Sequence, residues 1–168
     1  MTELTDRIAK LEAVEAIKIL KARYARACDP VPDADRIAAM YVEDGVFDCG
    51  ELFGVHHGRE AIRRHFSRGP EMIKWALHLI GSPIVEVADD LRSATGSWYL
   101  WQPMTSLDPD GRAQARWLTG EYHDTYTCDE HGTWRFATVR LVTGIHATYE
   151  HGWEPAAGTT PTDGEVHR

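Results

Sequence analysis

The chain has 168 residues, a formal net charge of -8 and 43% hydrophobic residues. This length and composition are typical of one globular domain with its own core. The acidic balance argues against nucleic-acid binding, which needs clustered Lys and Arg. The sequence also lacks a run of about 18 apolar residues, so we expect no membrane span.

Cysteine and histidine spacing gives no sign of a metal site or of a disulfide framework. Cys28, Cys49 and Cys128 are odd in number and form no C-x-x-C motif, and the histidines show no H-x-x-x-H spacing. Glycine-rich nucleotide motifs and a nucleophile elbow are missing as well. We therefore expect no cofactor and no metal. The first residues do not resemble a secretory signal, so a cytoplasmic location is expected.

Residues 3–28 are predicted to form one long helix, because apolar residues recur every three or four positions. The apolar stripe consists of Ile8, Leu11, Val14, Ile17, Leu20 and Tyr24. Charged residues, Lys21 among them, fall mostly outside it. Asp29 precedes Pro30 and is thereby disfavoured in the helical conformation, so the helix should end there.

Two shorter helices are expected at residues 33–41 and 58–66, the second ending near Gly69 and Pro70. Residues 45–57 between them should form a short strand and its return. Helical periodicity does not continue beyond this point.

From residue 75 onward the pattern is that of strands. Residues 75–87 form a long apolar run, and Gly81 and Pro83 within it predict a bend. Three further strands are predicted at residues 93–107, 113–128 and 133–148. Because short turns join them, the sheet should be mostly antiparallel.

Helices followed by a meander of strands predict a single α+β domain at residues 1–154. A strongly bent sheet wrapped over three N-terminal helices would make a cone, and a cone closed by apolar side chains is a natural pocket. Residues 155–168 are rich in Gly, Pro and Thr and should form a flexible C-terminal tail.

This order of elements resembles the SnoaL-like branch of the nuclear transport factor 2-like superfamily. The resemblance is carried by residues 14–24 with Asp29, 58–62, 94–100, 120–126 and 132–136. Within that branch the chain is most similar to lyases of the bile acid 7α-dehydratase and scytalone dehydratase type. The resemblance implies a cone-shaped, cystatin-like α+β barrel and a His–Asp pair that removes a proton without a cofactor.

By that resemblance His78 is the catalytic base, Asp29 orients it and Tyr24 is a nearby phenol. The residues themselves suit these roles, because a neutral imidazole accepts protons near neutral pH and a carboxylate can fix its tautomer. In a strand, His78 would face away from Leu77 and Leu79 and into the cone. Each catalytic candidate also has a structural interpretation: a buried helix tyrosine, a helix-end carboxylate and a satisfied core histidine.

Departures from the family pattern concern the groups that handle the rest of the substrate. Gln102 stands where the bile acid enzyme has an acidic residue, and Thr143 stands where it has an Arg. Cys128 lies near the position of the Arg in the related dehydrochlorinase. The resemblance therefore carries over the base but not the family's substrates.

Strand alternation predicts which residues line the cone. By the resemblance, the expected substrate-binding residues are Trp98, Leu100 and Gln102 on one strand and Tyr122, Asp124 and Tyr126 on the next. A cross-strand polar pair at the sheet surface is the alternative for Asp124. The six Trp residues indicate either core packing or an aromatic wall around a flat ligand.

Together these features predict a cofactor-independent lyase that acts on a hydrophobic, aromatic or polycyclic small molecule. Two alternatives stay open: an isomerase on the same scaffold, and a non-catalytic ligand-binding or oligomerisation subunit. Outward-facing Tyr99, Trp101 and Trp117 predict an apolar patch, so we expect a homo-oligomer. The relatives suggest a trimer or a dimer.

Overall fold

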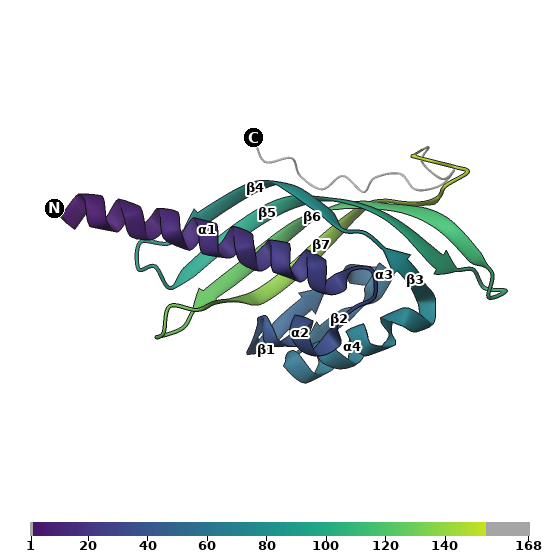
Figure 1. Cartoon of the computed structure of the whole chain (residues 1–168), viewed down its shortest axis with the longest axis horizontal. Coiled ribbons are helices and arrows are strands. Elements are labelled where there is room, and N and C mark those ends of the chain that lie inside the picture. The colour runs from purple at the N-terminus through teal and green to yellow at the C-terminus, as the bar shows by residue number, and fades with distance from the viewer. Residues whose placement is uncertain (1, 154–168) are drawn as a thin grey trace.

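The structure is a computed structural model that describes residues 2–153 (Figure 1). The flexible tail predicted at residues 155–168 lies outside the described residues. The helical segments are α1 (Thr2–Cys28), α2 (Ala34–Ala39), α3 (Gly50–Phe53) and α4 (Arg59–Met72). The strands are β1 (Tyr41–Asp48), β2 (Val55–His57), β3 (Ile73–Ala76), β4 (Leu79–Val87), β5 (Ser93–Leu107), β6 (Ala113–Cys128) and β7 (Trp134–Thr148).

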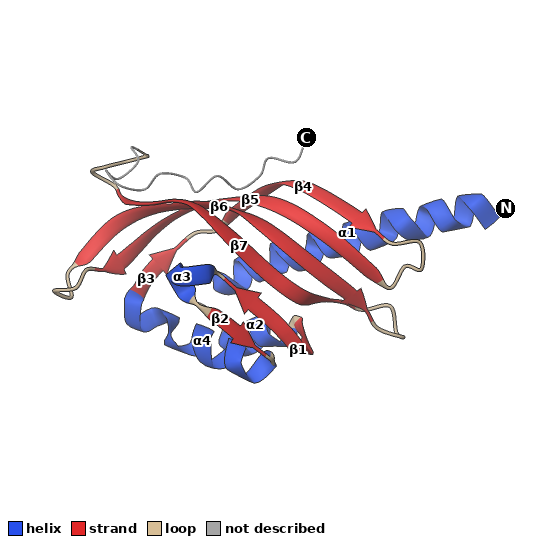
Figure 2. Cartoon of the chain, turned by 180° about the vertical axis from the view of Figure 1, so that it is seen from behind, coloured by secondary structure: helices blue, strands red, loops and turns tan. Residues whose placement is uncertain are grey.

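The strands form one curled sheet with the order β2-β1-β7-β6-β5-β3, and β4 pairs with β5 beyond this path (Figure 2). The long strands β5, β6 and β7 are antiparallel neighbours, as the sequence predicts. β1 pairs with β7 in parallel, so the sheet is mixed. The helices lie against its concave side (Figure 1). The predicted α+β cone is therefore confirmed. No helix within residues 2–153 is long and apolar enough to cross a membrane.

The last two thirds of α1 pack on the sheet as predicted, with Ile17, Leu20 and Tyr24 buried. The first third differs from the prediction, because Ile8 and Leu11 are 47% and 69% exposed. The helix projects past the end of the sheet there, so nothing in the described chain covers its apolar stripe (Figure 1). Lys21, predicted to lie off the stripe, is fully buried.

Phe136 on β7 lies at the centre of the core. Its ring centroid is 5.4 Å from that of Tyr24 and 5.3 Å from those of Tyr41 and Tyr126. Burying each such ring contributes roughly 2–3 kcal/mol relative to exposure. This aromatic cluster joins α1 to three strands and fixes where the end of α1 sits.

Two helix boundaries differ from the predictions. α2 ends at Ala39, because Tyr41 already pairs with Phe136 in the sheet, although Asp33 caps its start as expected. α4 continues through Pro70 to Met72 instead of ending there. The last carbonyls of α4 find donors nearby, since the Lys74 ammonium donates to the Pro70 oxygen at 2.8 Å. These bonds satisfy the extra turn.

The apolar run predicted as one strand at residues 75–87 is two strands, β3 and β4, separated at Leu77 and His78. Both pair with β5, and the register of β4 shifts between Gly81 and Ile84, where a bend was expected. The break matters because it frees the backbone of His78 from the sheet ladder. The side chain of Asp29, just after α1, therefore sets the position of the His78 imidazole, and strand alternation does not.

Candidate active site

A cavity of about 630 Å³ opens between the end of α1, the α3–β2 segment, α4 and the concave face of the sheet. This volume falls in the range of sites that enclose drug-sized ligands. Its walls are mainly apolar and aromatic, with a few polar groups. The lining includes Tyr24, His78, Gln102 and Tyr122 from the predicted site.

His78 and Asp29 form a hydrogen-bonded pair at the edge of this cavity. The His78 Nδ1 atom lies 2.6 Å from Asp29 Oδ1, and the His78 backbone N–H donates to Asp29 Oδ2 at 2.8 Å. Because an ionised carboxylate only accepts, Nδ1 carries the proton and Nε2 keeps its lone pair. Both side chains are largely buried, at 13% and 15% exposure. The arrangement suits an imidazole that accepts a proton at Nε2 while the carboxylate stabilises the resulting charge.

Tyr24 and Tyr122 place two phenols in the cavity wall, with ring centroids 6.4 Å apart in an edge-to-face arrangement. Burial raises the pKa of Tyr24 well above its usual value, and the nearby Cys28 adds to the rise. Burial likewise raises the pKa of Tyr122. Both hydroxyls therefore keep their protons at physiological pH and can donate hydrogen bonds to a developing oxyanion.

Gln102 is buried in β5 and lines the cavity, as predicted for its side of the strand. Its amide nitrogen makes only a long contact of 3.6 Å to the sulfur of Met104. A thioether is a weak acceptor, so the amide remains available to a ligand. Trp98 and Leu100 also face inward, but they pack in the core and are not among the residues that line the cavity.

Asp124 and Tyr126, expected to bind substrate, belong instead to a buried polar network behind the cavity wall. Lys21 Nζ lies 2.7 Å from Asp124 Oδ2, and the Tyr126 hydroxyl donates to the same oxygen at 2.8 Å. The Trp98 indole N–H donates to the Tyr126 hydroxyl at 3.1 Å. Asp124 is thus inward-facing, and the alternative of a surface pair is wrong.

The ammonium group of Lys21 also lies 3.4 Å from the ring centroid of Tyr122, within cation–π distance. Burial lowers the pKa of Lys21 and raises that of Asp124, while their mutual attraction opposes both changes. Each group therefore depends on the other for its charge. The network supports Tyr122 from behind, on the side away from the cavity.

The sequence interpretation missed the positions of three polar residues, His56, His65 and Lys21. His56, in the segment expected to return from the first short strand, and His65, on the helix expected at residues 58–66, were not assigned to the site, yet both line the cavity. Lys21 is buried despite its charge. A signal for Lys21 was present, because it follows Ile17 by four positions and precedes Tyr24 by three, which is the spacing of one helix face. An inward Asp124 also needs a counter-charge.

Metal-ligating side chains do not gather in threes anywhere in residues 2–153. Cys28 and Cys49 are free, line the cavity and have strongly raised pKa values. Burial raises the pKa of Cys49 to about 12. These thiols are therefore apolar wall groups and not nucleophiles.

The curled sheet over N-terminal helices, with a cavity at the end of α1, defines an α+β domain of the nuclear transport factor 2-like class. A family model for the SnoaL-like domain matches residues 9–140, and the chain belongs to this family. The family predicted from the sequence is thereby confirmed. No curated protein sequence matches the chain significantly.

Solved structures share this fold at low sequence identity. A candidate scytalone dehydratase from Novosphingobium aromaticivorans DSM 12444 aligns with a TM-score of 0.70 and 20% identity, over 89% of this chain and 92% of that one. The hexachlorocyclohexane dehydrochlorinase LinA-type3 from Novosphingobium barchaimii LL02 gives 0.72 and 16%, over 84% and 93%. A candidate aromatic ring hydroxylase from N. aromaticivorans gives 0.67 and 24%, over 82% and 94%. At these identities the likeness establishes the fold alone.

Proposed function

We propose that the protein is a cofactor-independent lyase that eliminates a small group from a hydrophobic, ring-containing molecule. The observation that carries the proposal is the His78–Asp29 pair, with its 2.6 Å contact, at the edge of a largely apolar cavity. A base with a fixed tautomer next to a greasy cavity suits removal of a proton from carbon, because desolvation strengthens the electrostatic interactions there.

In the proposed reaction, His78 Nε2 takes a proton from a carbon next to a carbonyl group. The C–H electron pair forms the enolate, whose oxygen accepts a hydrogen bond from the phenol of Tyr24. Collapse of the enolate forms the carbon–carbon double bond and breaks the bond to a leaving hydroxyl, which takes the proton back from the His78 imidazolium and departs as water, so that the neutral base is restored. Asp29 stabilises the imidazolium and stays hydrogen-bonded to His78 throughout the reaction.

The comparisons support an elimination without establishing it. The names of two similar structures, a dehydratase and a dehydrochlorinase, both describe eliminations. The same base would also serve an isomerase, in which the proton returns to another carbon. A non-catalytic ligand-binding or oligomerisation subunit is the second alternative.

Proton abstraction can be tested before the substrate is identified. We expect the protein to catalyse deuterium incorporation at the carbon next to the carbonyl of 1-tetralone in D₂O, measured by NMR. The variant His78→Gln should lower that rate at least about 100-fold, because it removes the base. The matched control is His57→Gln, which alters an exposed histidine on β2. An unchanged rate in His78→Gln would sink the assignment.

Two further probes distinguish a lyase from an isomerase. A lyase should convert 3-hydroxy-1-tetralone into water and 1-naphthol, which mass spectrometry detects as a loss of water. An isomerase should instead shift the double bond of a β,γ-unsaturated cyclic ketone without any change of mass. If neither ketone reacts and no deuterium enters 1-tetralone, the non-catalytic alternative replaces the lyase.

We also propose a cytoplasmic homo-oligomer, a trimer or a dimer. The outer sheet face carries an aromatic cluster in which Trp101 and Trp117 have ring centroids 5.1 Å apart, and Tyr149 and Trp153 pack beside them. Tyr99 and Trp153 are largely exposed. Exposed apolar patches of this kind commonly mark association. Sedimentation of the full chain gives the oligomeric state, and a monomer at micromolar concentration would contradict it.

A further inference from the structure

The cavity contains a second pair of histidines that the proposed reaction does not use. His56 on β2 and His65 on α4 have ring centroids 4.2 Å apart and an interplanar angle of 30°. Both line the cavity that His78 lines. They come from the wall built by the α3–β2 segment and α4, whereas His78 comes from the break between β3 and β4. Polar side chains therefore enter the cavity from more than one of its walls.

Packing fixes the position of the His65 ring. The residue shares a helix face with Ala61, Gly69 and Met72 at steps of four, four and three, and all four line the cavity. Aromatic rings surround the imidazole: its centroid lies 5.1 Å from those of Phe47 and Phe66 and 6.4 Å from that of Phe53. A ring held on several sides presents its nitrogens in a defined direction and loses little further entropy on binding.

The two imidazoles differ in hydrogen bonding. His56 Nε2 lies 2.9 Å from the carbonyl oxygen of Phe53, and because a carbonyl only accepts, this nitrogen carries the proton. His56 is thereby tied to the backbone and supports the His65 ring. Neither nitrogen of His65 has a hydrogen-bond partner among the described residues. A partly buried donor and acceptor without protein partners favours a ligand that supplies them.

Burial, and then the neighbouring His56, lower the pKa of His65 to about 4. The ring is therefore neutral at physiological pH, with one N–H donor and one lone pair. The acidic and arginine side chains that line the cavity are Glu51, Arg64, Arg68 and Glu71. Arg64 lies 3.4 Å from Glu60, which also lies 2.8 Å from Arg63, and Arg68 lies 3.5 Å from Glu71. The side chains of Arg64 and Arg68 are mostly exposed, whereas the His65 ring is partly buried and offers its hydrogen bonds to an uncharged group.

We propose that His65, supported by His56, is a second polar subsite that hydrogen-bonds an uncharged hydroxyl or carbonyl oxygen on the substrate ring. The inference rests on the proposed function and narrows its substrate class. Besides the carbonyl and the leaving hydroxyl at the His78 end, the substrate then carries a further oxygen function at a ring position held by His65.

Binding measurements on the full chain test this subsite without any turnover. Calorimetric titration compares 1-tetralone with 5-, 6- and 7-hydroxy-1-tetralone. At least one hydroxylated probe should bind about three- to tenfold more tightly than 1-tetralone, which corresponds to one net hydrogen bond. A carboxylate in place of that hydroxyl should weaken binding.

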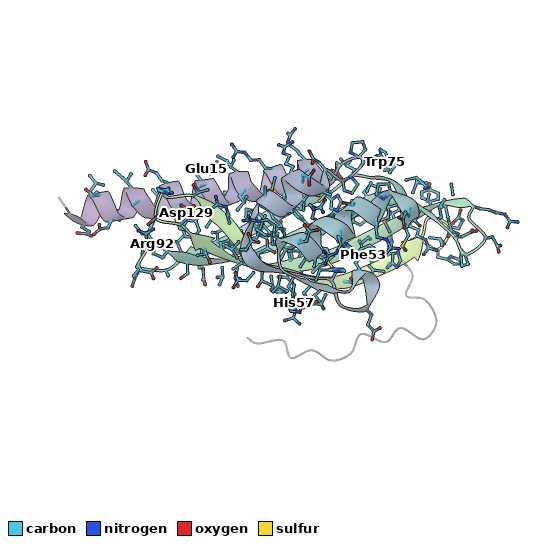
Figure 3. All side chains as sticks on the ribbon, turned by 90° about the horizontal axis from the view of Figure 1, so that it is seen from below. Glu15, Phe53, His57, Trp75, Arg92 and Asp129 are labelled. Carbon is cyan, nitrogen blue, oxygen red and sulfur yellow. The ribbon has the colours of Figure 1, made fainter. Side chains whose placement is uncertain are left out.

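The variant His65→Phe keeps an aromatic ring in the cage and removes both nitrogens. It should bind 1-tetralone within about twofold of the unmodified chain and lose the preference for the hydroxyl. His65→Gln, which keeps a donor and an acceptor, should retain part of the preference and serves if His65→Phe does not fold. His57→Phe is the matched control on the exposed side of β2 and should leave the preference intact (Figure 3).

Three results would overturn the proposal: a hydroxyl preference that survives in His65→Phe, no preference in the unmodified chain, or no binding of any probe. A different result would contradict the proposed function, because that function requires deuterium exchange that depends on His78. His78→Gln should lose exchange and keep the hydroxyl preference, whereas His65→Phe should lose the hydroxyl preference. The two hypotheses can therefore fail separately.

Discussion

Two aspartate contacts of helix α1 and a third just beyond its end have almost the same length and very different surroundings. Lys10 and Lys21 each lie 2.7 Å from an aspartate oxygen, Asp89 and Asp124 respectively. The first pair is 44% and 100% exposed, and the second is 1% and 0% exposed. Beyond the helix end, Asp29 lies 2.6 Å from His78 at an intermediate exposure. Distance is nearly constant, so access to solvent is what separates the three.

The comparison shows what each degree of access permits. Water screens the exposed pair, which leaves it little influence on stability. The buried pair cannot exchange protons freely, and each partner depends on the other for its charge. The pair at the cavity edge is shielded enough to fix a tautomer and open enough to meet a substrate. Of the three, it alone is placed to take a proton from a ligand.

The largest expected effect is on the buried pair. Lys21→Met leaves Asp124 buried without a counter-charge and should lower the free energy of unfolding by about 3–5 kcal/mol. Urea denaturation monitored by circular dichroism measures the loss. The double variant Lys21→Met with Asp124→Asn should recover much of it, because the amide can still accept from Tyr126. A double variant no more stable than the single one would contradict this explanation.

The cavity-edge pair should respond in activity and hardly at all in stability. Asp29→Asn keeps an oxygen for the His78 backbone N–H but removes the charge that stabilises the imidazolium. We expect the rate of deuterium incorporation into 1-tetralone to fall about 100-fold or more, with the free energy of unfolding changed by less than about 1 kcal/mol. A large loss of stability with unchanged exchange would reverse the roles of the two pairs.

The sequence predicted features that depend on local signals and missed those that depend on contacts between distant segments. Strands β5 and β6 begin and end where expected, because alternation and turn residues such as Pro109 and Gly111 are local signals. Inward and outward faces follow from these boundaries, and Gln102 and Tyr122 line the cavity. Asp29 and His78 come together as the resemblance implied, although they are 49 positions apart.

The missed features depend on contacts between distant segments. Lys21 is buried only because β6 brings Asp124 and Tyr122 to it, and charge alone predicts the surface. His56 and His65 line the cavity because β2 and α4 pack side by side, which periodicity within either segment does not reveal. Leu11 shows the opposite error, since its helix continues past the sheet that would have covered it.

Acid should weaken the fold through His65, by a smaller amount. The folded protein keeps this imidazole neutral down to a pKa of about 4, while the unfolded chain binds a proton near the ordinary value of 6.5. Between these values the unfolded state holds more protons, so the stabilisation is complete above pH 6.5 and is lost as pH falls toward 4. With allowance for partial exposure we expect about 1–2 kcal/mol.

Urea denaturation at pH 7 and pH 4.5 measures this loss, and the variant His65→Phe isolates it. The pH-dependent difference between the two chains is the quantity of interest, since other groups titrate in both. His65→Phe should lose less stability than the unmodified chain over that interval, and His57→Phe should behave as the unmodified chain does. Identical losses in all three chains would show that His65 titrates normally in the fold.

The smallest effect is expected at the exposed pair. Lys10→Met removes the contact between Lys10 on α1 and Asp89 in the turn after β4, which has the same chemistry and length as the buried pair. The Lys10 ammonium lowers the pKa of Asp89 through a hydrogen bond and through charge attraction, but both groups are exposed, so water and salt replace the contact readily. The urea midpoint should not move measurably at low salt, nor at roughly 0.5 M sodium chloride, where salt screens the exposed charges. A shift comparable to that of Lys21→Met would mean that contact geometry, and not exposure, decides the value of these pairs.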